Sequence, residues 1–422
     1  MDSAVSPKAG TAPKTVAVIG AGIVGVSAAL FLQRDGHRVT LIDREGPAAG
    51  TSFGNAGGVV TTSCAPLVLP GMLRRVPRML LDPLGPLVVR WRYLPWIAPW
   101  LVRLIQASRP ARVERIADAL AALNRQVEAP WRSLAQQAGV AELLHPVGWL
   151  KVYETDAGFA ASQGERDLMA HRGLRFDVLD ADELRQLEPG LAPIFKHGFF
   201  QSEGLFVADP GGVVRALAGD FVARGGQLQT EEVTGFRLNA RPHRLMTAGG
   251  GMIEADVVVL AAGAWSRGLA KRLGARVPLD TERGYHLMLP PAEPGLSRPS
   301  VHGEQGFTLS PMQDGIRLCS QVEFAGLKAP PDFRRVRALL PAAKRMLPGL
   351  VAEERSAWLG FRPSLPDSLP VIGPSPRYAD VYLAFGHGHL GMTQGPLTGR
   401  IVADLVAGRD SGFDISPYRP ER

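Results

Sequence analysis

The sequence predicts an α/β protein built around a parallel sheet, and three stretches of the chain carry this prediction. Two short β-branched runs, residues 15–19 and 38–43, flank a glycine-rich turn and a helical pattern. A third run, Glu254–Gly263, is read as an apolar strand of the kind that is buried on both faces of a parallel sheet. At 422 residues the chain exceeds one compact domain, so we expect two domains that share a large core.

Composition and charge narrow the function classes. Hydrophobic residues make up 45% and charged residues 21%, which is ordinary globular usage. The net charge of +7 would attract anions, but the arginines are scattered and form no basic run, so we predict no nucleic-acid partner. With only Cys64 and Cys319 we expect no disulfide, no metal site, and two small buried hydrophobic side chains. Residues 1–13 lack a secretory pattern, which predicts a flexible tail and a cytoplasmic protein.

The first turn has the composition of a dinucleotide-binding motif. Gly20 allows a tight turn, Gly22 lets the backbone approach a pyrophosphate, and Gly25 lets the helix expected over Val26–Asp35 pack closely on the strand. Asp43 ends the second strand 18 positions after Gly25, where a ribose hydroxyl would bind. The order strand, turn, helix, strand and acidic residue therefore predicts a Rossmann-like dinucleotide site.

Further along, three segments favour FAD over NAD. The small residues of Thr51–Gly58 follow the second strand without a long intervening helix, which offers a second close approach to a cofactor. The strand read in Glu254–Gly263 would end at the ligand crevice. A late strand, Val381–Phe385, leads into Gly386–Thr393 and a helix expected over Pro396–Val406.

Between these segments the pattern predicts other elements. Leu84–Ala107 combines aromatic and apolar residues with arginines, and Pro95 and Pro99 should break any long helix there. It fits either an interfacial membrane contact or a lid or core segment. Helical spacing predicts a helix over Val113–Ala129 that ends or kinks at Pro130, and alternation predicts a strand over Gly148–Glu154. Asp182 is expected to cap a helix.

Five segments together resemble the D-amino-acid dehydrogenases of the D-amino acid oxidase, glycine oxidase and sarcosine oxidase superfamily. They are Gly20–Gly25, Ser52–Gly58, Ala261–Trp265, Phe361–Gly373 and Gly386–Thr393. The resemblance covers nearly the whole chain after residue 14. It implies a discontinuous FAD-binding domain (14–75, 203–276 and 359–412) and an α+β substrate domain with a mostly antiparallel sheet (76–202 and 277–358).

The motifs and the resemblance assign non-covalent FAD to one set of residues. The sarcosine oxidase branch of the superfamily attaches FAD through a cysteine near its Arg-Pro segment. This chain has no cysteine near Arg362 and Pro363, so the resemblance implies that FAD is not bound covalently. The predicted FAD-binding residues are Gly20, Gly22, Ile23, Val24, Gly25, Asp43, Arg44, Thr51, Ser52, Asn55, Ala56, Gly57, Gly58, Val233, Ala262, Gly263, Trp265, Gly388, His389, Leu390, Gly391, Met392 and Thr393.

The resemblance implies oxidative deamination of a small amino acid, most simply a D-amino acid. Hydride would pass from Cα to flavin N5, and the imine would hydrolyse to a 2-keto acid. Arg362 matches the arginine that binds the substrate carboxylate in the family, where a planar guanidinium fixes a carboxylate bidentately. Tyr285 resembles a second carboxylate ligand, the alternative being an ordinary strand aromatic. The turn Gly391–Gln394 is expected to stabilise negative charge at flavin N1 and the C2 carbonyl.

Several points stay open at this level. His286, His387 and His389 are candidates to accept the amine proton or to position water, although the proton may instead leave to solvent. Electrons would pass to a quinone or another carrier at the inner face of a membrane, or to oxygen in an oxidase. A secondary-amine acid such as sarcosine, proline or hydroxyproline, glycine itself, and a flavin subunit of a heteromeric complex are the alternative functions. The oligomeric state has no sequence signal.

Overall fold

A computed structural model describes residues 12–70, 87–238, 240–320 and 322–422. Most of the tail predicted for residues 1–13 and the start of the Leu84–Ala107 segment lie outside these ranges. Within them, a six-stranded sheet has the order β10-β2-β1-β14-β22-β21, parallel except for the last pair. Its strands are β1 (Thr15–Ile19), β2 (Arg38–Asp43), β10 (Gln227–Thr230), β14 (Val257–Leu260), β21 (Val371–Pro374) and β22 (Val381–Phe385).

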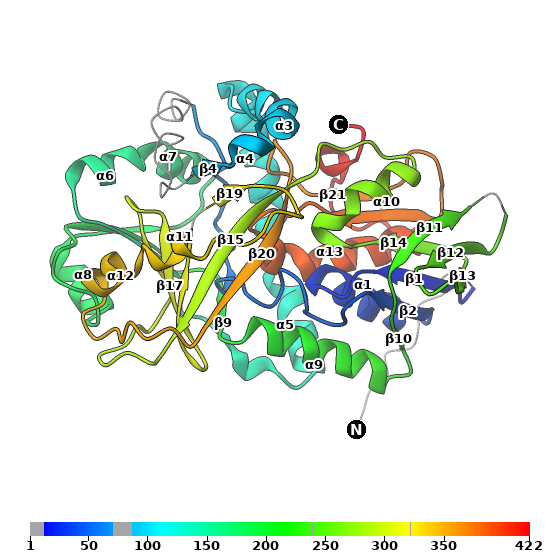
Figure 1. Cartoon of the computed structure of the whole chain (residues 1–422), viewed down its shortest axis with the longest axis horizontal. Coiled ribbons are helices and arrows are strands. Elements are labelled where there is room, and N and C mark those ends of the chain that lie inside the picture. The colour runs from blue at the N-terminus through cyan, green and yellow to red at the C-terminus, as the bar shows by residue number, and fades with distance from the viewer. Residues whose placement is uncertain (1–11, 71–86, 239, 321) are drawn as a thin grey trace.

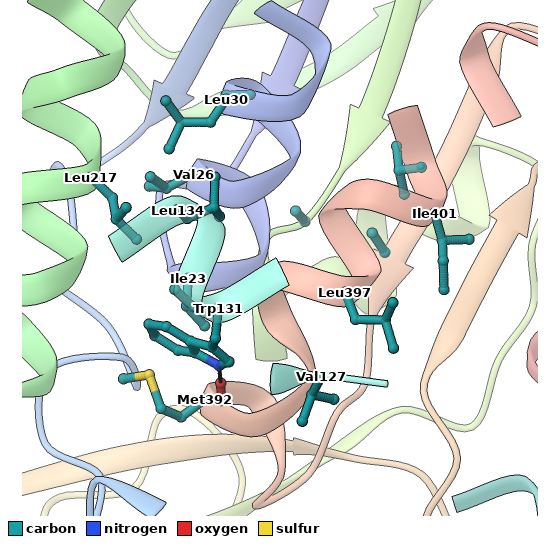
Figure 2. Packing of buried hydrophobic residues seen from close by; sticks show 14 of the residues in the cluster. Ile23, Val26, Leu30, Val127, Trp131, Leu134, Leu217, Met392, Leu397 and Ile401 are labelled. Carbon is teal, nitrogen blue, oxygen red and sulfur yellow. Dashed lines mark hydrogen bonds between the residues drawn. The ribbon is translucent and has the colours of Figure 1, made fainter. Parts of the chain in front are cut away.

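Two helices from opposite ends of the chain pack side by side on this sheet. α1 (Ile23–Arg34) and α13 (Gly391–Val406) approach closely because Gly399 faces the α1 backbone, where a Cβ would lie 2.6 Å from the nitrogen of Ala28. α9 (Pro210–Ala223) and α5 (Glu128–Gln137) complete the cluster, and Figure 2 shows Trp131 of α5 beside Ile23 of α1 and Met392 of α13. This packing fixes the N-termini of α1 and α13 at one end of the sheet.

α13 begins five residues before the predicted start at Pro396, which lies inside the helix. A proline has no N–H to offer to the carbonyl four residues earlier, here that of Met392. The indole Nε1–H of Trp131 donates to that carbonyl at 2.8 Å instead (Figure 2). The helix continues through the proline because a tertiary contact replaces the missing hydrogen bond.

The second sheet has ten strands and lies beside the first (Figure 1). Its order is β4-β19-β15-β18-β17-β16-β6-β8-β7, with β20 also paired to β15, and all pairs are antiparallel except β16–β6 and β19–β4. The predicted mostly antiparallel sheet is therefore confirmed. Its strands are β4 (Leu87–Val89), β6 (Trp149–Tyr153), β7 (Asp177–Leu179), β8 (His197–Gln201), β15 (Asp280–Leu289), β16 (Ser300–His302), β17 (Phe307–Met312), β18 (Gly315–Cys319), β19 (Val322–Phe324) and β20 (Ser356–Ser364).

Two three-stranded sheets and several short helices complete the described residues. One sheet joins β3 (Gly58–Val59), β9 (Leu205–Val207) and β5 (Leu144–His145), and the other joins β11 (Val233–Arg237), β12 (His243–Thr247) and β13 (Met252–Ala255). The short helices are η2 (Trp91–Tyr93), η3 (Ala141–Leu143), α6 (Asp156–Ala161), α7 (Gln163–His171), α8 (Ala181–Leu187), η4 (Gly263–Trp265), α10 (Ser266–Arg272), α11 (Arg334–Arg337), α12 (Leu340–Met346) and η5 (Ser416–Tyr418).

The predicted domain division stays a prediction. Strands from all three predicted cofactor segments do pair in the six-stranded sheet. The cut predicted at residue 359 passes through β20, which belongs to the ten-stranded sheet.

Four predicted elements differ from the structure. α3 (Leu94–Ala107) is a continuous helix despite Pro99, because Pro95 lies in its first turn, where no N–H partner is needed, and only Pro99 removes a bond. The helix predicted over Val113–Ala129 is α4 (Pro110–Asn124), and Pro130 lies in the first turn of α5 rather than at a helix end.

The other two differences are local. Asp180, not Asp182, caps α8, and it accepts hydrogen bonds from the backbone of Asp182 and Glu183. The apolar strand predicted over Glu254–Gly263 is two elements: the end of β13 and the buried β14.

None of the helices in the ranges that the structure describes combines the length and hydrophobicity needed to cross a membrane.

Candidate active site

A cavity of about 780 Å³ lies between the carboxyl ends of β1, β2, β14 and β22 and one face of the ten-stranded sheet. Ligands in open parallel sheets bind at this edge. Most residues predicted to bind FAD line it: Gly20, Gly22, Ile23, Val24, Asp43, Arg44, Thr51, Ser52, Asn55, Ala56, Gly58, Val233, Ala262, Gly263, Trp265, Gly388, His389, Leu390, Gly391, Met392 and Thr393.

The N-terminus of α1 opens into this cavity. Gly20 has φ +106°, and its N–H donates to the carbonyl of Ile42 at 2.7 Å, which ties the start of the turn to β2. A Cβ at Gly22 would meet only the Ser52 hydroxyl, at 3.1 Å, so this side of the turn is open toward the cavity. The N-cap residue, Gly22, has no side chain to cap the helix, and of the first amides that of Ile23 donates to the Ser52 hydroxyl. The helix dipole and the remaining amides of the first turn suit the pyrophosphate of a dinucleotide.

The acidic residue at the end of β2 is partly engaged by backbone. Asp43 accepts from the N–H of Ala21 at 2.8 Å and from those of Glu45 and Gly46 at 2.9 and 3.0 Å. Nearby, the guanidinium of Arg44 lies 4.0 Å from the ring centroid of Trp265. The predicted ribose contact of Asp43 stays a prediction, and these side chains form the end of the cavity that would hold the adenosine half.

The loop after β2 is held against both sheets. Ser52 accepts from the N–H of Ile23 at 3.0 Å, and Thr51 donates to the carbonyl of Phe361 at 2.8 Å. The buried guanidinium of Arg317 donates to the carbonyl of Asn55 at 2.7 Å. The loop is thus fixed by contacts with residues that lie far away in the sequence.

At the start of α13 a second helix N-terminus meets the cavity, with Leu390 at the N-cap and no side-chain cap. The Thr393 hydroxyl accepts from the N–H of Val60 and donates to the carbonyl of Gly58, both at 3.2 Å. The N–H of Gln394 donates to the carbonyl of Leu390 at 2.8 Å. The stabilisation of negative charge that was predicted for Gly391–Gln394 stays a prediction for the amides that precede it.

Two predicted cofactor residues support the cavity without lining it. A Cβ at Gly25 would overlap the carbonyl of Gly20, and one at Gly57 would overlap the carbonyl of Val207. Both glycines therefore allow close backbone packing behind the cavity wall. Their predicted contact with the cofactor stays untested.

The opposite wall is one face of the ten-stranded sheet. Directly paired residues share a face, and register places six side chains in one row across β6, β16, β17, β18, β15 and β20. The row is Lys151, Val301, Thr308, Cys319, His286 and Trp358, and all but His286 line the cavity.

Arg362 lies on this face, four residues beyond Trp358 on β20. Its guanidinium passes over Gly284, where a Cβ would lie 2.6 Å from Cζ. It donates to the carbonyl of Ser320 at 3.3 Å and forms no ion pair with any described residue. Beside it, burial raises the pKa of the Glu282 carboxyl against the opposing effects of Ser364 and Arg362. An arginine without a carboxylate partner at a cavity wall can bind the carboxylate of a ligand.

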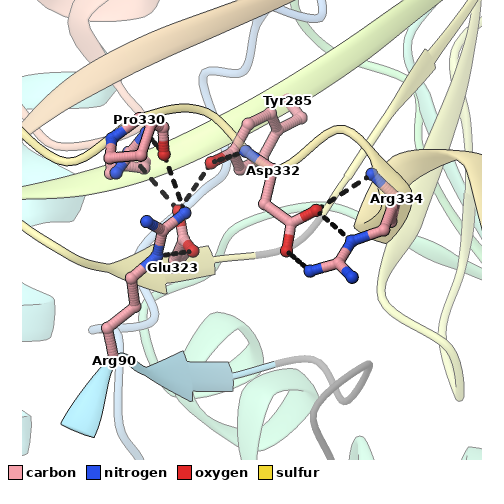
Figure 3. A network of polar contacts seen from close by, with 7 residues as sticks. Arg90, Tyr285, Glu323, Pro330, Asp332 and Arg334 are labelled. Carbon is pink, nitrogen blue, oxygen red and sulfur yellow. Dashed lines mark hydrogen bonds and ion pairs between the residues drawn. The ribbon is translucent and has the colours of Figure 1, made fainter.

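Tyr285 lines the cavity, but alternation along β15 places its side chain on the opposite face of the sheet from Gly284 and His286. Its hydroxyl donates to Glu323 at 2.6 Å and accepts from the N–H of Asp332 at 3.1 Å (Figure 3). Arg90 binds the same carboxylate at 2.7 Å. The predicted role of Tyr285 as a carboxylate ligand would require its hydroxyl to leave this network.

The three predicted histidines differ in environment. His286 stacks on Trp358 with its Nδ1 2.9 Å from the carbonyl of Gly54, and His387 contacts the Thr398 hydroxyl at 3.0 Å. Burial lowers the pKa of His286 to about 4 and that of His387 to about 3. His389 exposes its ring to the cavity, and desolvation there, helped by the charges of Arg362 and Lys151, lowers its pKa to about 4. All three rings are neutral near pH 7.

Sequence reasoning missed most of the sheet wall. Trp149, Lys151, Glu165, Gln201, Val301, Thr308 and Trp358 line the cavity without having been predicted. The one signal in the sequence for this wall was Lys151, a charged residue inside the strand predicted over Gly148–Glu154. Cys64 is buried as expected, whereas Cys319 is only partly buried and lines the cavity, because register places it beside His286.

Comparisons with known proteins agree with this geometry. The family model described as FAD dependent oxidoreductase matches residues 15–405. A D-amino-acid oxidase of Bradyrhizobium diazoefficiens is 39% identical over 96% of this chain and 98% of its own length. A D-amino acid dehydrogenase of Sinorhizobium medicae is 32% identical over 95% and 98%. The crystal structure of glycine oxidase from Geobacillus kaustophilus superposes with a TM-score of 0.73 at 23% identity, covering 98% of this chain and 99% of that chain.

Proposed function

Because this chain belongs to the FAD dependent oxidoreductase family, we propose that it oxidises the bond between Cα and nitrogen in a D-amino acid. FAD is the cofactor and the chain is an oxidoreductase. The observation that carries the proposal is the position of Arg362, an arginine without an ion-pair partner in the described residues, on the wall of the cavity that the predicted FAD-binding residues line. The names of the two relatives from Bradyrhizobium diazoefficiens and Sinorhizobium medicae support a D-amino acid as the substrate.

One wall of the cavity would bind FAD and the other would bind the substrate. The α1 turn, the Ser52–Gly58 loop and the start of α13 would hold FAD, which supplies a hydride acceptor when bound. Arg362 would bind the substrate carboxylate bidentately and so fix the rotation of Cα. Preorganised amides at the start of α13 would stabilise negative charge on that side of the cavity.

Proton handling follows from the environment of His389. A ring with a pKa of about 4 is a weak base, so it cannot readily take a proton from a substrate ammonium group. We therefore propose that the substrate loses this proton to solvent and that His389 orients the amine by hydrogen bonding. The imine product then hydrolyses in water to a 2-keto acid and ammonia.

A secondary-amine acid such as sarcosine, proline or hydroxyproline is the second candidate substrate. The test is a steady-state assay of the FAD-loaded protein with D- and L-isomers and these secondary amines, using an artificial electron acceptor. We expect D-isomers to yield 2-keto acid and ammonia in equal amounts. Turnover of L-isomers only, or of secondary amines without ammonia release, would contradict the proposal. An inert isolated chain would instead favour a subunit of a heteromeric complex.

For the electron acceptor we propose a quinone at a membrane surface. Trp91 on η2 and Trp96 on α3 are 72% and 77% exposed, and α3 also exposes Val102 and Ile105. Aromatic and aliphatic side chains flanked by the exposed Arg92 and Arg103 suit an anionic lipid interface. On its other face α3 contacts β20, where Trp100 Nε1 lies 3.4 Å from the carbonyl of Ser364. The surface is therefore one helix away from the strand that carries Arg362.

Sedimentation with anionic phospholipid vesicles tests this contact. Replacing Trp91 and Trp96 by serine should weaken binding, whereas Met252→Ser, at a distant site that is 56% exposed, should not. Equal binding by both variants would contradict the membrane contact. Hydrogen peroxide formation in air as fast as turnover with the artificial acceptor would identify an oxidase instead.

A further inference from the structure

The indole of Trp358 forms a part of the cavity wall that the predicted FAD-binding residues do not explain. Trp358 lies on β20, is partly buried and lines the cavity. Its six-membered ring covers Gly360, where an added Cβ would overlap Cη2 and Cζ3 of the indole. Gly360 lies between Trp358 and Arg362 on the same face of this strand. The ring therefore extends along β20 toward the arginine.

Contacts from the neighbouring loop and strand hold this ring in place. A Cβ at Gly54, in the loop after β2, would overlap the same six-membered ring. The imidazole of His286, the residue paired with Trp358 on β15, stacks on the indole with the ring centroids 5.2 Å apart and the planes 24° from parallel. His286 Nδ1 lies 2.9 Å from the carbonyl of Gly54, so the histidine and the loop support the indole together. Trp358 thus presents a fixed apolar surface to the cavity.

Strand pairing brings this surface close to the guanidinium of Arg362. Gly360 pairs directly with Gly284 on β15, and the guanidinium covers Gly284 as the indole covers Gly360. Cβ positions of directly paired residues lie about 5 Å apart in antiparallel strands. The near edge of the indole therefore lies at most about 10 Å from Cζ of Arg362. A carboxylate bound to Arg362 by hydrogen bonds of about 2.8 Å leaves the side chain of the same amino acid within reach of the indole.

We propose that Trp358 determines the side-chain specificity of the enzyme and selects a D-amino acid with a large apolar side chain, above all an aromatic one. This inference rests on the proposed function and narrows its substrate class. A large side chain of a substrate held at Arg362 meets the indole, and the contact removes apolar surface of both partners from water. An aromatic ring gains more, because paired aromatic rings attract each other beyond the area that they bury. The methyl group of D-alanine is too short to make this contact.

Steady-state kinetics of the FAD-loaded enzyme with D-phenylalanine and D-alanine test this assignment, with an artificial electron acceptor. In the wild type we expect kcat/KM for D-phenylalanine to exceed that for D-alanine by roughly 10- to 100-fold, the gain from burying one large apolar side chain. Trp358→Ala should lower kcat/KM for D-phenylalanine by about 10-fold or more and change that for D-alanine by less than about twofold. Trp358→Phe keeps an aromatic ring and should restore most of the preference. The amount and visible spectrum of bound FAD should stay the same in both variants.

Trp149 provides the matched control, because it is a tryptophan that lines the same cavity from β6. The five steps between neighbouring strands from β6 to β20 amount to roughly 24 Å along the sheet. Trp149→Ala should therefore leave the ratio of kcat/KM between the two substrates unchanged. A loss of this ratio as large as that in Trp358→Ala would contradict the assignment of specificity to Trp358.

Other results would also overturn the assignment. A wild type that turns over D-alanine as efficiently as D-phenylalanine does so, even if the Trp358 variants fail to fold. So does an unchanged ratio in Trp358→Ala. A variant that loses FAD or its visible spectrum and slows both substrates equally would place the indole against the flavin instead. If neither amino acid is turned over by the wild type, the proposed function fails and the assignment fails with it.

Discussion

Gly284→Ala tests the placement of the carboxylate-binding arginine without changing its charge. A Cβ at Gly284 would lie 2.6 Å from Cζ of Arg362, whereas ordinary van der Waals contact begins at 3.4 Å. The guanidinium must therefore move by at least about 0.8 Å, the difference between these two values, because Nη2 lies closer still to the added Cβ. A misplacement of about 1 Å can lower catalysis on the order of 10²-fold, because the bound substrate leaves its reactive orientation.

We expect kcat/KM of Gly284→Ala for a D-amino acid to fall by about 10²-fold, with bound FAD unchanged in amount and visible spectrum. Steady-state kinetics with an artificial acceptor measure the loss. Gly219→Ala is the matched control, since a Cβ there meets nothing within 4 Å. In an Arg362→Ala background the Gly284 substitution should add no further loss. Wild-type kinetics for Gly284→Ala, or a full additional loss in the double variant, would refute the assigned role of Arg362.

Three further predictions use other parts of the site. Arg362→Ala should lower kcat/KM by roughly 10²- to 10³-fold through loss of a charge-assisted contact of a half-buried guanidinium, and normal kinetics would remove it from the site. His389→Asn should leave the pH profile of kcat/KM between pH 6 and 8 unchanged in shape, because this ring, with a pKa of about 4, is already neutral there. The unfolded chain binds protons to His286 and His387 between their lowered pKa values and the ordinary 6.5. The free energy of unfolding should therefore decrease as pH falls from 6.5 toward 4, by up to about 1.4 kcal/mol per pH unit for each ring. Denaturant titrations at several pH values check this, and His387→Gln should reduce the slope.

Half of the cavity could be predicted from the sequence because its chemistry is local. The turn at Gly20 and Gly22, the acidic end of β2 and the small residues of the following loop each need only neighbours along the chain. These motifs predicted one wall of the cavity and the strands that lead to it.

The other wall could not be predicted because it arises from register between distant strands. Lys151, Thr308 and Trp358 share one face of the sheet only because of strand pairings that no local sequence pattern encodes. Alternation within β6 shows that Lys151 shares a face with Trp149, but it does not show which face meets the cavity.

The predicted helix boundaries were wrong where a tertiary contact stabilises a helix that the local sequence alone would end. Pro396 should end or begin a helix, yet Trp131 supplies the donor that the proline lacks. Pro99 lies within α3, whose buried Ile97 and Trp100 anchor that turn.

The most direct measurement is anaerobic mixing of the FAD-loaded protein with D- and L-enantiomers of the same amino acids, followed by the visible absorbance of the flavin. The account predicts rapid bleaching by D-enantiomers, slow bleaching at best by L-enantiomers, and loss of this difference in rate in Arg362→Ala. A flavin that stays oxidised with every D-amino acid, while the protein is folded and carries FAD, would contradict it.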